Sequence, residues 1–204
     1  MAEPKVCVSL EGITVDEMID EANRANIAGA DYVEVRFDKL YLIKPEPTVS
    51  ENEDGEKISK MPPETEWTVK DFEEIDIEES ISALKEAIPV PVIFTVRPVR
   101  EGGFFAGNEK QRLDVLSKAI KSEVSFVDLE LSIEEKDRKK LHSSATDSGS
   151  KVIASYHDSS ATPSANEIIE LVRSNYDKGD IIKFCSSISN HQDSLQIIEA
   201  AHTL

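Results

Sequence analysis

Short runs of apolar and β-branched residues recur along the chain, and longer stretches between them repeat apolar residues every three or four positions. The short runs are typical of strands, and the longer stretches are typical of amphipathic helices. Strand and helix therefore alternate, which predicts parallel strands joined by right-handed crossovers. The expected strands span 5–10, 32–37, 90–96, 126–131, 151–156 and 181–185, and helical periodicity covers 15–22, 81–88, 113–120, 168–172 and 195–201.

Polar residues near the ends of these strands favour a closed barrel over an open doubly wound sheet. Alternate strand residues face the same side, so Glu34 lies beside Arg36 and Ser155 beside His157. Charged groups that converge at strand C-terminal ends surround the mouth of a barrel, whereas an open sheet binds ligands in loops at one switch point. We expect an α/β fold of the TIM-type (β/α)8 barrel, in one domain over residues 1–204. Thr14 is the expected N-cap of the helix that follows it.

Composition limits the partners. Asp and Glu outnumber Lys and Arg by 40 to 23, and the formal charge of -17 would repel nucleic acid and an anionic membrane surface. No apolar run approaches the roughly 18 residues of a membrane helix, and no leader pattern opens the chain, so we expect a cytoplasmic protein. Residues 44–76 are acidic, and prolines there are expected to interrupt any periodic element in a mobile surface insertion. The prolines are Pro45, Pro47, Pro62 and Pro63.

Lys183 lies within an apolar run where an uncharged strand residue is expected. A lysine among apolar neighbours loses hydration, which lowers its pKa and makes the neutral amine accessible for attack on a carbonyl. With His157 as a proton shuttle, the pair indicates Schiff-base chemistry. Cys7 and Cys185 lie in apolar runs without the closely spaced Cys and His residues of a zinc site, so buried reduced thiols and no metal are expected.

A set of motifs then stands in one order along the chain: Glu34-Val35-Arg36-Phe37-Asp38, Phe94-Thr95-Val96-Arg97, Glu101-Gly102-Gly103, Asp128-Leu129-Glu130-Leu131, Ser155-Tyr156-His157-Asp158 and Lys183. In content and order they resemble the type I 3-dehydroquinate dehydratases of the shikimate pathway. Val8-Ser9-Leu10-Glu11-Gly12 resembles the first strand of that family, and Thr162-Pro163 follows the histidine as in its members. The resemblance covers most of the chain apart from the acidic insertion.

The resemblance implies a lyase that dehydrates 3-dehydroquinate to 3-dehydroshikimate without a cofactor, within aromatic amino acid and chorismate biosynthesis. Lys183 would form an iminium with the substrate ketone, and the cationic nitrogen would acidify the adjacent carbon. His157 would remove that proton and protonate the departing hydroxyl, a task suited to an ordinary histidine pKa near 6.5. Glu101 would orient and polarise His157, from a loop made flexible by Gly102 and Gly103.

Substrate contacts also follow from the resemblance. Glu34, Arg36 and Arg97 match residues that bind substrate oxygens in the family, and Ser9 matches a contact near the end of the first strand. An internal layer of ion pairs is the alternative role for the first three. Asp128 and Glu130 are interpreted mainly as interior partners of the arginines and of Lys183.

The family barrel has eight strand–helix units, and about six are found before Leu204. The expected explanations are a fragment, a second polypeptide that completes the barrel, or a truncated inactive homologue that acts as a scaffold or binding protein. A class I aldolase is the alternative enzyme, because barrel lysines also form Schiff bases in carbon–carbon cleavage. The expected partner is the small-molecule substrate, and a homodimer stays open.

Overall fold

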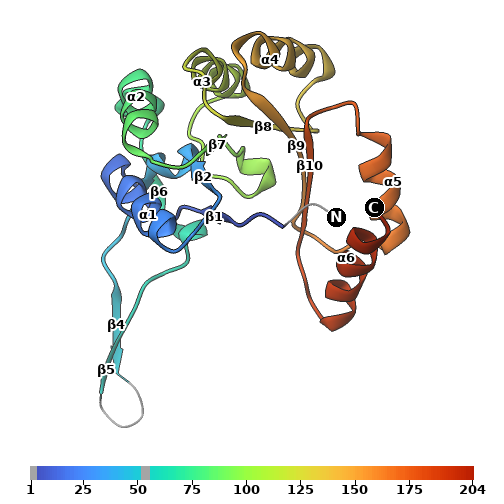
Figure 1. Ribbon diagram of the computed structural model, residues 1–204. Helices are drawn as coiled ribbons and strands as arrows, with labels where there is room; N and C mark the ends of the chain where they lie inside the picture. The colour runs from blue at the N-terminus through green and yellow to red at the C-terminus, as the bar shows by residue number, and fades with distance from the viewer. Residues whose placement is uncertain (1–3, 52–55) are drawn as a thin grey trace.

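The main sheet of the computed structural model has six parallel strands whose order follows the chain without a reversal. The structure describes residues 4–51 and 56–204. A doubly wound sheet reverses its strand order at a switch point, so this order excludes the open alternative. The sheet curls, and its two edge strands are β1 and β10 (Figure 1). Its strands in spatial order are β1 (Cys7–Ser9), β2 (Tyr32–Arg36), β7 (Val92–Thr95), β8 (Phe126–Glu130), β9 (Lys151–Asp158) and β10 (Ile181–Ser186).

Helices follow the strands and line the outer side of the curl (Figure 1). The first begins where the sequence predicts, because the Thr14 hydroxyl accepts a hydrogen bond of 3.2 Å from the backbone of Glu17. Its apolar stripe of Met18, Ala22 and Ala25 is buried. The helices are α1 (Val15–Ile27), α2 (Ile77–Ala87), α3 (Glu109–Lys121), α4 (Glu135–Ser148), α5 (Ala165–Ser174) and α6 (His191–Thr203).

Two hydrophobic clusters hold these layers together. The larger one packs β2, β7 and β8 against α1 to α4. The smaller one joins α5 and α6 through Ile168, Val172 and Ala200, and Phe184 of β10 packs against it. The C-terminal part of the sheet therefore rests on a core of its own.

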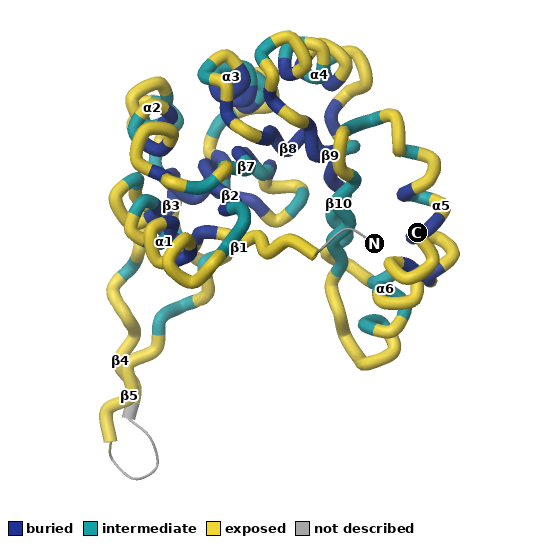
Figure 2. Tube along the Cα trace, in the orientation of Figure 1, coloured by how far each residue is buried: buried dark blue, intermediate teal, exposed yellow. Residues whose placement is uncertain are grey.

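The acidic insertion contains a regular element that its prolines do not interrupt. Strands β4 (Thr48–Glu51) and β5 (Lys57–Lys60) form an antiparallel hairpin, and β3 (Leu42–Ile43) pairs with β6 (Thr68–Val69) at its base. The expectation that the prolines interrupt any periodic element is wrong for these residues, because the prolines lie outside the paired strands. The hairpin projects from the body and is exposed along its length (Figure 2), and residues 52–55 lie outside the described part.

The two cysteines are less buried than expected. Cys7 is exposed and Cys185 is half-buried. Both lie on edge strands, which neighbouring strands cover on one side only. In the part of the chain that the structure describes, no helix is long and apolar enough to cross a membrane.

Candidate active site

Glu34 of β2 is the centre of a polar cluster at the C-terminal ends of the strands. Its Oε1 accepts hydrogen bonds of 2.8 Å from Thr95 Oγ1 and from Lys183 Nζ. The Arg97 guanidinium lies 3.4 Å from the same oxygen, and the Ser9 hydroxyl donates to Oε2. The structure thus brings together four of the residues singled out from the sequence, namely Ser9, Glu34, Arg97 and Lys183.

Lys183 is held by carboxylates and not by apolar neighbours. Its Nζ lies 2.8 Å from Glu34 Oε1 and 3.3 Å from Asp128 Oδ2. Burial lowers the pKa of Lys183, but the negative charges of Asp128 and Glu34 outweigh it and raise the pKa above its ordinary value. The predicted lowering of the Lys183 pKa is therefore wrong, since the sequence window shows apolar neighbours on β10 and not the carboxylates from β2 and β8.

The same contacts keep Glu34 ionised. Burial alone would raise the pKa of Glu34, whose side chain is 8% exposed. Lys183, Ser9 and Arg97 outweigh burial and lower the pKa to about 2. The cluster is accordingly built to stabilise a positive charge at the position of Nζ.

His157 of β9 is fixed by Glu101. Its Nδ1 lies 2.8 Å from Glu101 Oε2, and both side chains are about nine-tenths buried. An ionised carboxylate can only accept, so Nδ1 carries the proton. Ser132, which the sequence analysis did not single out, donates to the other oxygen of Glu101. Although burial raises the pKa of Glu101, the hydrogen bonds from His157 and Ser132 lower it overall.

The pKa of His157 differs from the ordinary value expected for a shuttle. Burial lowers it, but the contacts with Cys185 and Glu101 raise it to about 9. In the unliganded site the ring is an imidazolium at neutral pH. The group is therefore ready to donate a proton, and it must lose one before it can act as a base.

The loop that carries Glu101 owes its shape to both glycines. Gly102 has φ of 77°, in the left-handed region, and ends the short 3-10 turn Val99–Glu101. A Cβ on Gly103 would lie 2.0 Å from the carbonyl oxygen of Arg97. The interpretation of these glycines as a source of flexibility is replaced by one of shape, because Gly103 permits a close backbone approach that positions Glu101.

Arg36 lies beside this cluster without an ion pair to Glu34. Its guanidinium binds Asp38 through two hydrogen bonds, of 2.9 Å and 2.7 Å. Asp38 also accepts from the backbone of Arg97 at 3.2 Å and of Phe104 at 3.0 Å. The Arg36–Asp38 pair thus connects the end of β2 to the loop that carries Glu101.

A buried ion pair lies next to Asp128. Glu130 Oε2 accepts from Arg112 at 2.7 Å, and Arg112 also donates to the Val96 carbonyl at 2.9 Å. Glu130 is thus an interior partner of an arginine, as predicted. That arginine is Arg112 of α3, which the sequence analysis did not single out. The available signal was a charged residue on the inward stripe of that helix, since Arg112 is three positions before Val115.

Two buried nitrogens in this region lack protein partners. Arg97 Nε and His157 Nε2 make no hydrogen bond to any described residue. Unpaired buried polar groups are costly, so they favour a ligand that supplies oxygen atoms. Over residues 4–51 and 56–204, no group of three or more His, Cys, Asp or Glu side chains is placed to hold a metal ion.

Comparison with known proteins places these residues in one family. The family model described as type I 3-dehydroquinase matches residues 6–204. The 3-dehydroquinate dehydratase of Methanothermobacter thermautotrophicus is 33% identical over 195 residues, which are 96% of this chain and 71% of that protein. The enzyme of the same name from Methanocaldococcus jannaschii is 40% identical over 111 residues, 53% of this chain and 50% of that protein. The aligned part thus spans about half the length of the latter relative.

Solved structures show the same fold. The type I 3-dehydroquinate dehydratase of Clostridium difficile, with covalently modified comenic acid, has a TM-score of 0.75 at 24% identity, over 98% of this chain and 69% of that one. A dehydroquinate dehydratase and shikimate dehydrogenase from S. pombe has a TM-score of 0.69 at 22% identity, over 99% of this chain and 34% of that one.

Proposed function

Because the chain belongs to the type I 3-dehydroquinase family, we propose that it dehydrates 3-dehydroquinate to 3-dehydroshikimate through a Schiff base on Lys183, as a lyase of the shikimate pathway. The observation that carries the proposal is the position of Lys183 Nζ between Glu34 and Asp128, at 2.8 Å and 3.3 Å. These carboxylates favour a cation at this nitrogen. An iminium is such a cation, so the charge that they stabilise before the reaction is kept during it.

The reaction starts with a proton transfer from Lys183. The ammonium must become an amine before attack, and the carboxylates that contact Nζ are its nearest acceptors. The amine adds to the substrate ketone, and loss of water gives the iminium. The iminium draws electrons from the adjacent carbon, which acidifies the hydrogen there.

His157 then handles both protons of the elimination. Its neutral Nε2 takes the proton from the acidified carbon, and the electron pair moves toward the iminium to form an enamine. The imidazolium returns a proton to the departing hydroxyl, which leaves as water. The positive charge of the iminium disfavours a second positive charge on the imidazole nearby. Iminium formation therefore lowers the pKa of His157 below its value in the unliganded site, and the neutral base becomes available. Hydrolysis of the new iminium frees Lys183.

The proposed substrate contacts use polar groups of the site that can still form hydrogen bonds with a ligand. Arg97 Nε is buried without a protein partner and is a donor for a substrate oxygen. Glu34 and Ser9 offer an acceptor and a hydroxyl next to it. Arg36 is proposed to act in the same group from its place beside Asp38, with its geometry fixed by the paired carboxylate.

Borohydride trapping tests the proposal. The chain is incubated with 3-dehydroquinate and borohydride, and peptides are mapped by mass spectrometry. We expect a reduced adduct on Lys183 in the wild type and in Lys140→Met, a matched change at an exposed position of α4. Lys183→Met should carry none, and His157→Ala should form the adduct but not turn over.

Product absorbance separates the enzyme classes. Dehydration gives a conjugated enone that absorbs in the ultraviolet, whereas aldol cleavage gives none.

Equal trapping in wild type and Lys183→Met, with both proteins folded by circular dichroism, would contradict the assignment of Lys183. A folded wild type without any adduct would favour the inactive scaffold.

A further inference from the structure

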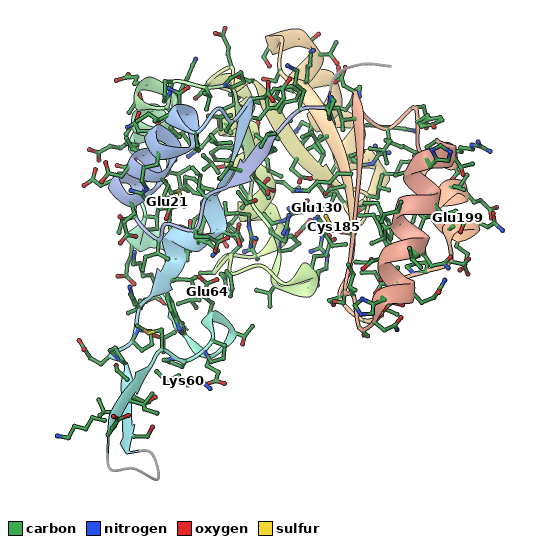
Figure 3. The ribbon with its side chains drawn as sticks, turned by 60° about the horizontal axis from the view of Figure 1, so that its bottom comes forward. Glu21, Lys60, Glu64, Glu130, Cys185 and Glu199 are labelled. Atoms are coloured by element: carbon green, nitrogen blue, oxygen red, sulfur yellow. The ribbon has the colours of Figure 1, made fainter. Side chains whose placement is uncertain are left out.

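Cys185 faces the same interior as Lys183 and has no part in the proposed mechanism. The two residues are separated by one position on β10, so their side chains leave the strand on the same side. In the parallel ladder, Cys185 is the direct partner of His157 on β9. Figure 3 shows Cys185 projecting from β10 toward the inner side of the sheet.

The imidazole of His157 has a different polar neighbour at each side. Glu101 binds Nδ1 at 2.8 Å, and the ring also interacts with the Cys185 thiol. Nε2 is buried without a closely directed hydrogen bond to a described residue, and the His157 side chain is 8% exposed. A thiol placed next to an imidazole that is itself bound to a carboxylate is the arrangement by which proteins activate a nucleophilic sulfur.

The charges that face the thiol are positive. They come from His157 on β9, Lys183 on β10 and Arg97 after β7. Burial raises the pKa of Cys185, but the contact with His157 and the charges of Lys183 and Arg97 outweigh it and lower the pKa. A lower pKa increases the fraction of thiolate, which is the reactive form.

Cys7 provides the opposite environment within the same chain. It is exposed, whereas Cys185 is half-buried. Partial removal from water and the negative charge of Glu34 raise the pKa of Cys7, although Lys183 acts in the other direction. Access alone therefore favours modification of Cys7, and the electrostatic setting favours Cys185.

We propose that Cys185 is a modification site for small hydroperoxides, and that its oxidation blocks the proton transfers of His157. The second part of this proposal rests on the proposed function, and the first part does not. Adjacency in the ladder supports both parts, because any group added to the sulfur enters the space next to the ring.

The oxidation is a two-electron displacement. The Cys185 thiolate attacks one peroxide oxygen, an S–O bond forms and the O–O bond breaks. The second oxygen leaves with the electron pair and takes a proton from the His157 imidazolium, so that water or an alcohol departs. The sulfur becomes a sulfenic acid, and the hydroperoxide is reduced.

Alkylation tests the reactivity without reference to catalysis. The folded chain is treated with limiting iodoacetamide at neutral pH, and both cysteine peptides are quantified by mass spectrometry against a fully denatured sample. We expect Cys185 to react several times faster than Cys7. His157→Ala should slow the alkylation of Cys185, although the smaller side chain increases access to its sulfur. The alkylation rate of Cys7 should stay the same. Faster reaction of Cys7, no reaction at Cys185, or indifference of Cys185 to His157→Ala would overturn the proposal.

Peroxide treatment tests the block. Hydrogen peroxide should remove most dehydration activity from the wild type and from Cys7→Ala, and dithiothreitol should restore it. The dehydration activity of Cys185→Ala should stay at the level that this variant shows before treatment, both after hydrogen peroxide and after dithiothreitol. Loss of activity in Cys185→Ala to the same extent would refute the block and leave the alkylation result standing. If the untreated chain shows no dehydration, the proposed function fails while the alkylation result still decides the reactivity of Cys185.

Discussion

At the scale of single residues, the site is governed by the charge that surrounds Lys183. Glu34 and Asp128 contact its Nζ, and Arg97 contacts Glu34 from the segment that follows β7. The cluster raises the pKa of the lysine and lowers that of Glu34. The resting pair is therefore ionised, and the same field that delays loss of the lysine proton would stabilise the proposed iminium.

The low pKa of Glu34 predicts a specific acid sensitivity. A carboxyl whose folded pKa is about 2 and whose ordinary value is 4.5 stabilises the fold above pH 4.5, and this contribution is lost as the pH falls through about 2. The difference corresponds to about 3 kcal/mol. Urea unfolding of wild type and Glu34→Gln should give free energies of unfolding that differ most near pH 6 and converge in acid. A constant difference at all pH values would contradict the assigned pKa.

Glu101 should act through His157 and not through Lys183. Glu101→Gln removes the charge that favours the imidazolium, so the pKa of His157 should fall and the limb of the activity profile that it controls should move to lower pH. Turnover should drop about 10- to 100-fold, less than the roughly 100- to 10,000-fold that proton transfer by a positioned side chain contributes, because His157 itself is kept. The borohydride adduct on Lys183 should persist. A variant that loses the adduct, or keeps the wild-type profile, would show that Glu101 has another role.

The sequence allowed several of these residues to be identified, together with the pairing of Glu101 with His157 and of Asp128 with Lys183, but not the combined electrostatic effect of their contacts. Lys183, His157 and Glu101 were found because they stand in recognisable motifs. The direction of the Lys183 shift was predicted wrongly because its partners lie 149 and 55 positions away along the chain. Ser132 has no distinguishing neighbours in the sequence, and the sequence around Cys185 shows Lys183 but not His157, so only the folded arrangement reveals these contacts.

At the scale of elements, strands were easier to predict than helices. Each strand of the main sheet begins within two positions of its expected start and ends within two positions of its expected end. Helix α4 shows little apolar periodicity in the sequence because one of its three buried residues is an arginine: they are Arg138, Leu141 and Ala145. The hairpin β4–β5 was missed because its two short, exposed strands carry no apolar alternation. Tertiary contacts of the buried residues decided α4, and antiparallel pairing between β4 and β5 decided the hairpin.

The 3-10 turn before Gly102 gives a prediction at this scale. Gly103→Ala would place a Cβ 2.0 Å from the Arg97 carbonyl oxygen, and backbone there cannot yield as a side chain could. We expect a loss of about 1–3 kcal/mol in stability together with a large loss of turnover, since Glu101 must move.

A matched glycine separates the two effects. Gly149→Ala, at the end of α4, keeps open space around its Cβ but has φ of 80°. It should cost about 1–2 kcal/mol in stability and leave turnover unchanged. Equal losses of turnover in both variants would indicate a general effect of instability instead of displacement of Glu101.

At the scale of the whole molecule, one ion pair reports the curvature of the sheet. Glu34 is on β2 and Lys183 is on β10, with β7, β8 and β9 between them in the strand order. Flat strands spaced about 4.8 Å apart would separate β2 from β10 by about 19 Å. The observed distance of 2.8 Å therefore requires a curled sheet whose inner side chains meet. The sequence predicted this closure through the placement of polar residues at strand ends and through the resemblance to a barrel family.

The separate C-terminal core predicts uneven stability. Strand β10 pairs with β9 on one side only, and α5 and α6 rest on the smaller hydrophobic cluster. Hydrogen exchange measured by mass spectrometry should be faster in β10, α5 and α6 than in β2 and β8. Lys183→Met should accelerate exchange in β10 further without changing α2. Uniform exchange across the sheet would show that the two clusters unfold as one unit.

The link between Lys183 and Glu34 also has a consequence for the time order of assembly. Lys183, the proposed nucleophile, lies 149 positions after Glu34 in the chain. A contact between such distant parts of a chain forms late, because a long loop must close first. The chemistry at Lys183 should therefore appear after most of the secondary structure during refolding. The amount of borohydride adduct on Lys183, measured at successive refolding times, would report when the fold is complete.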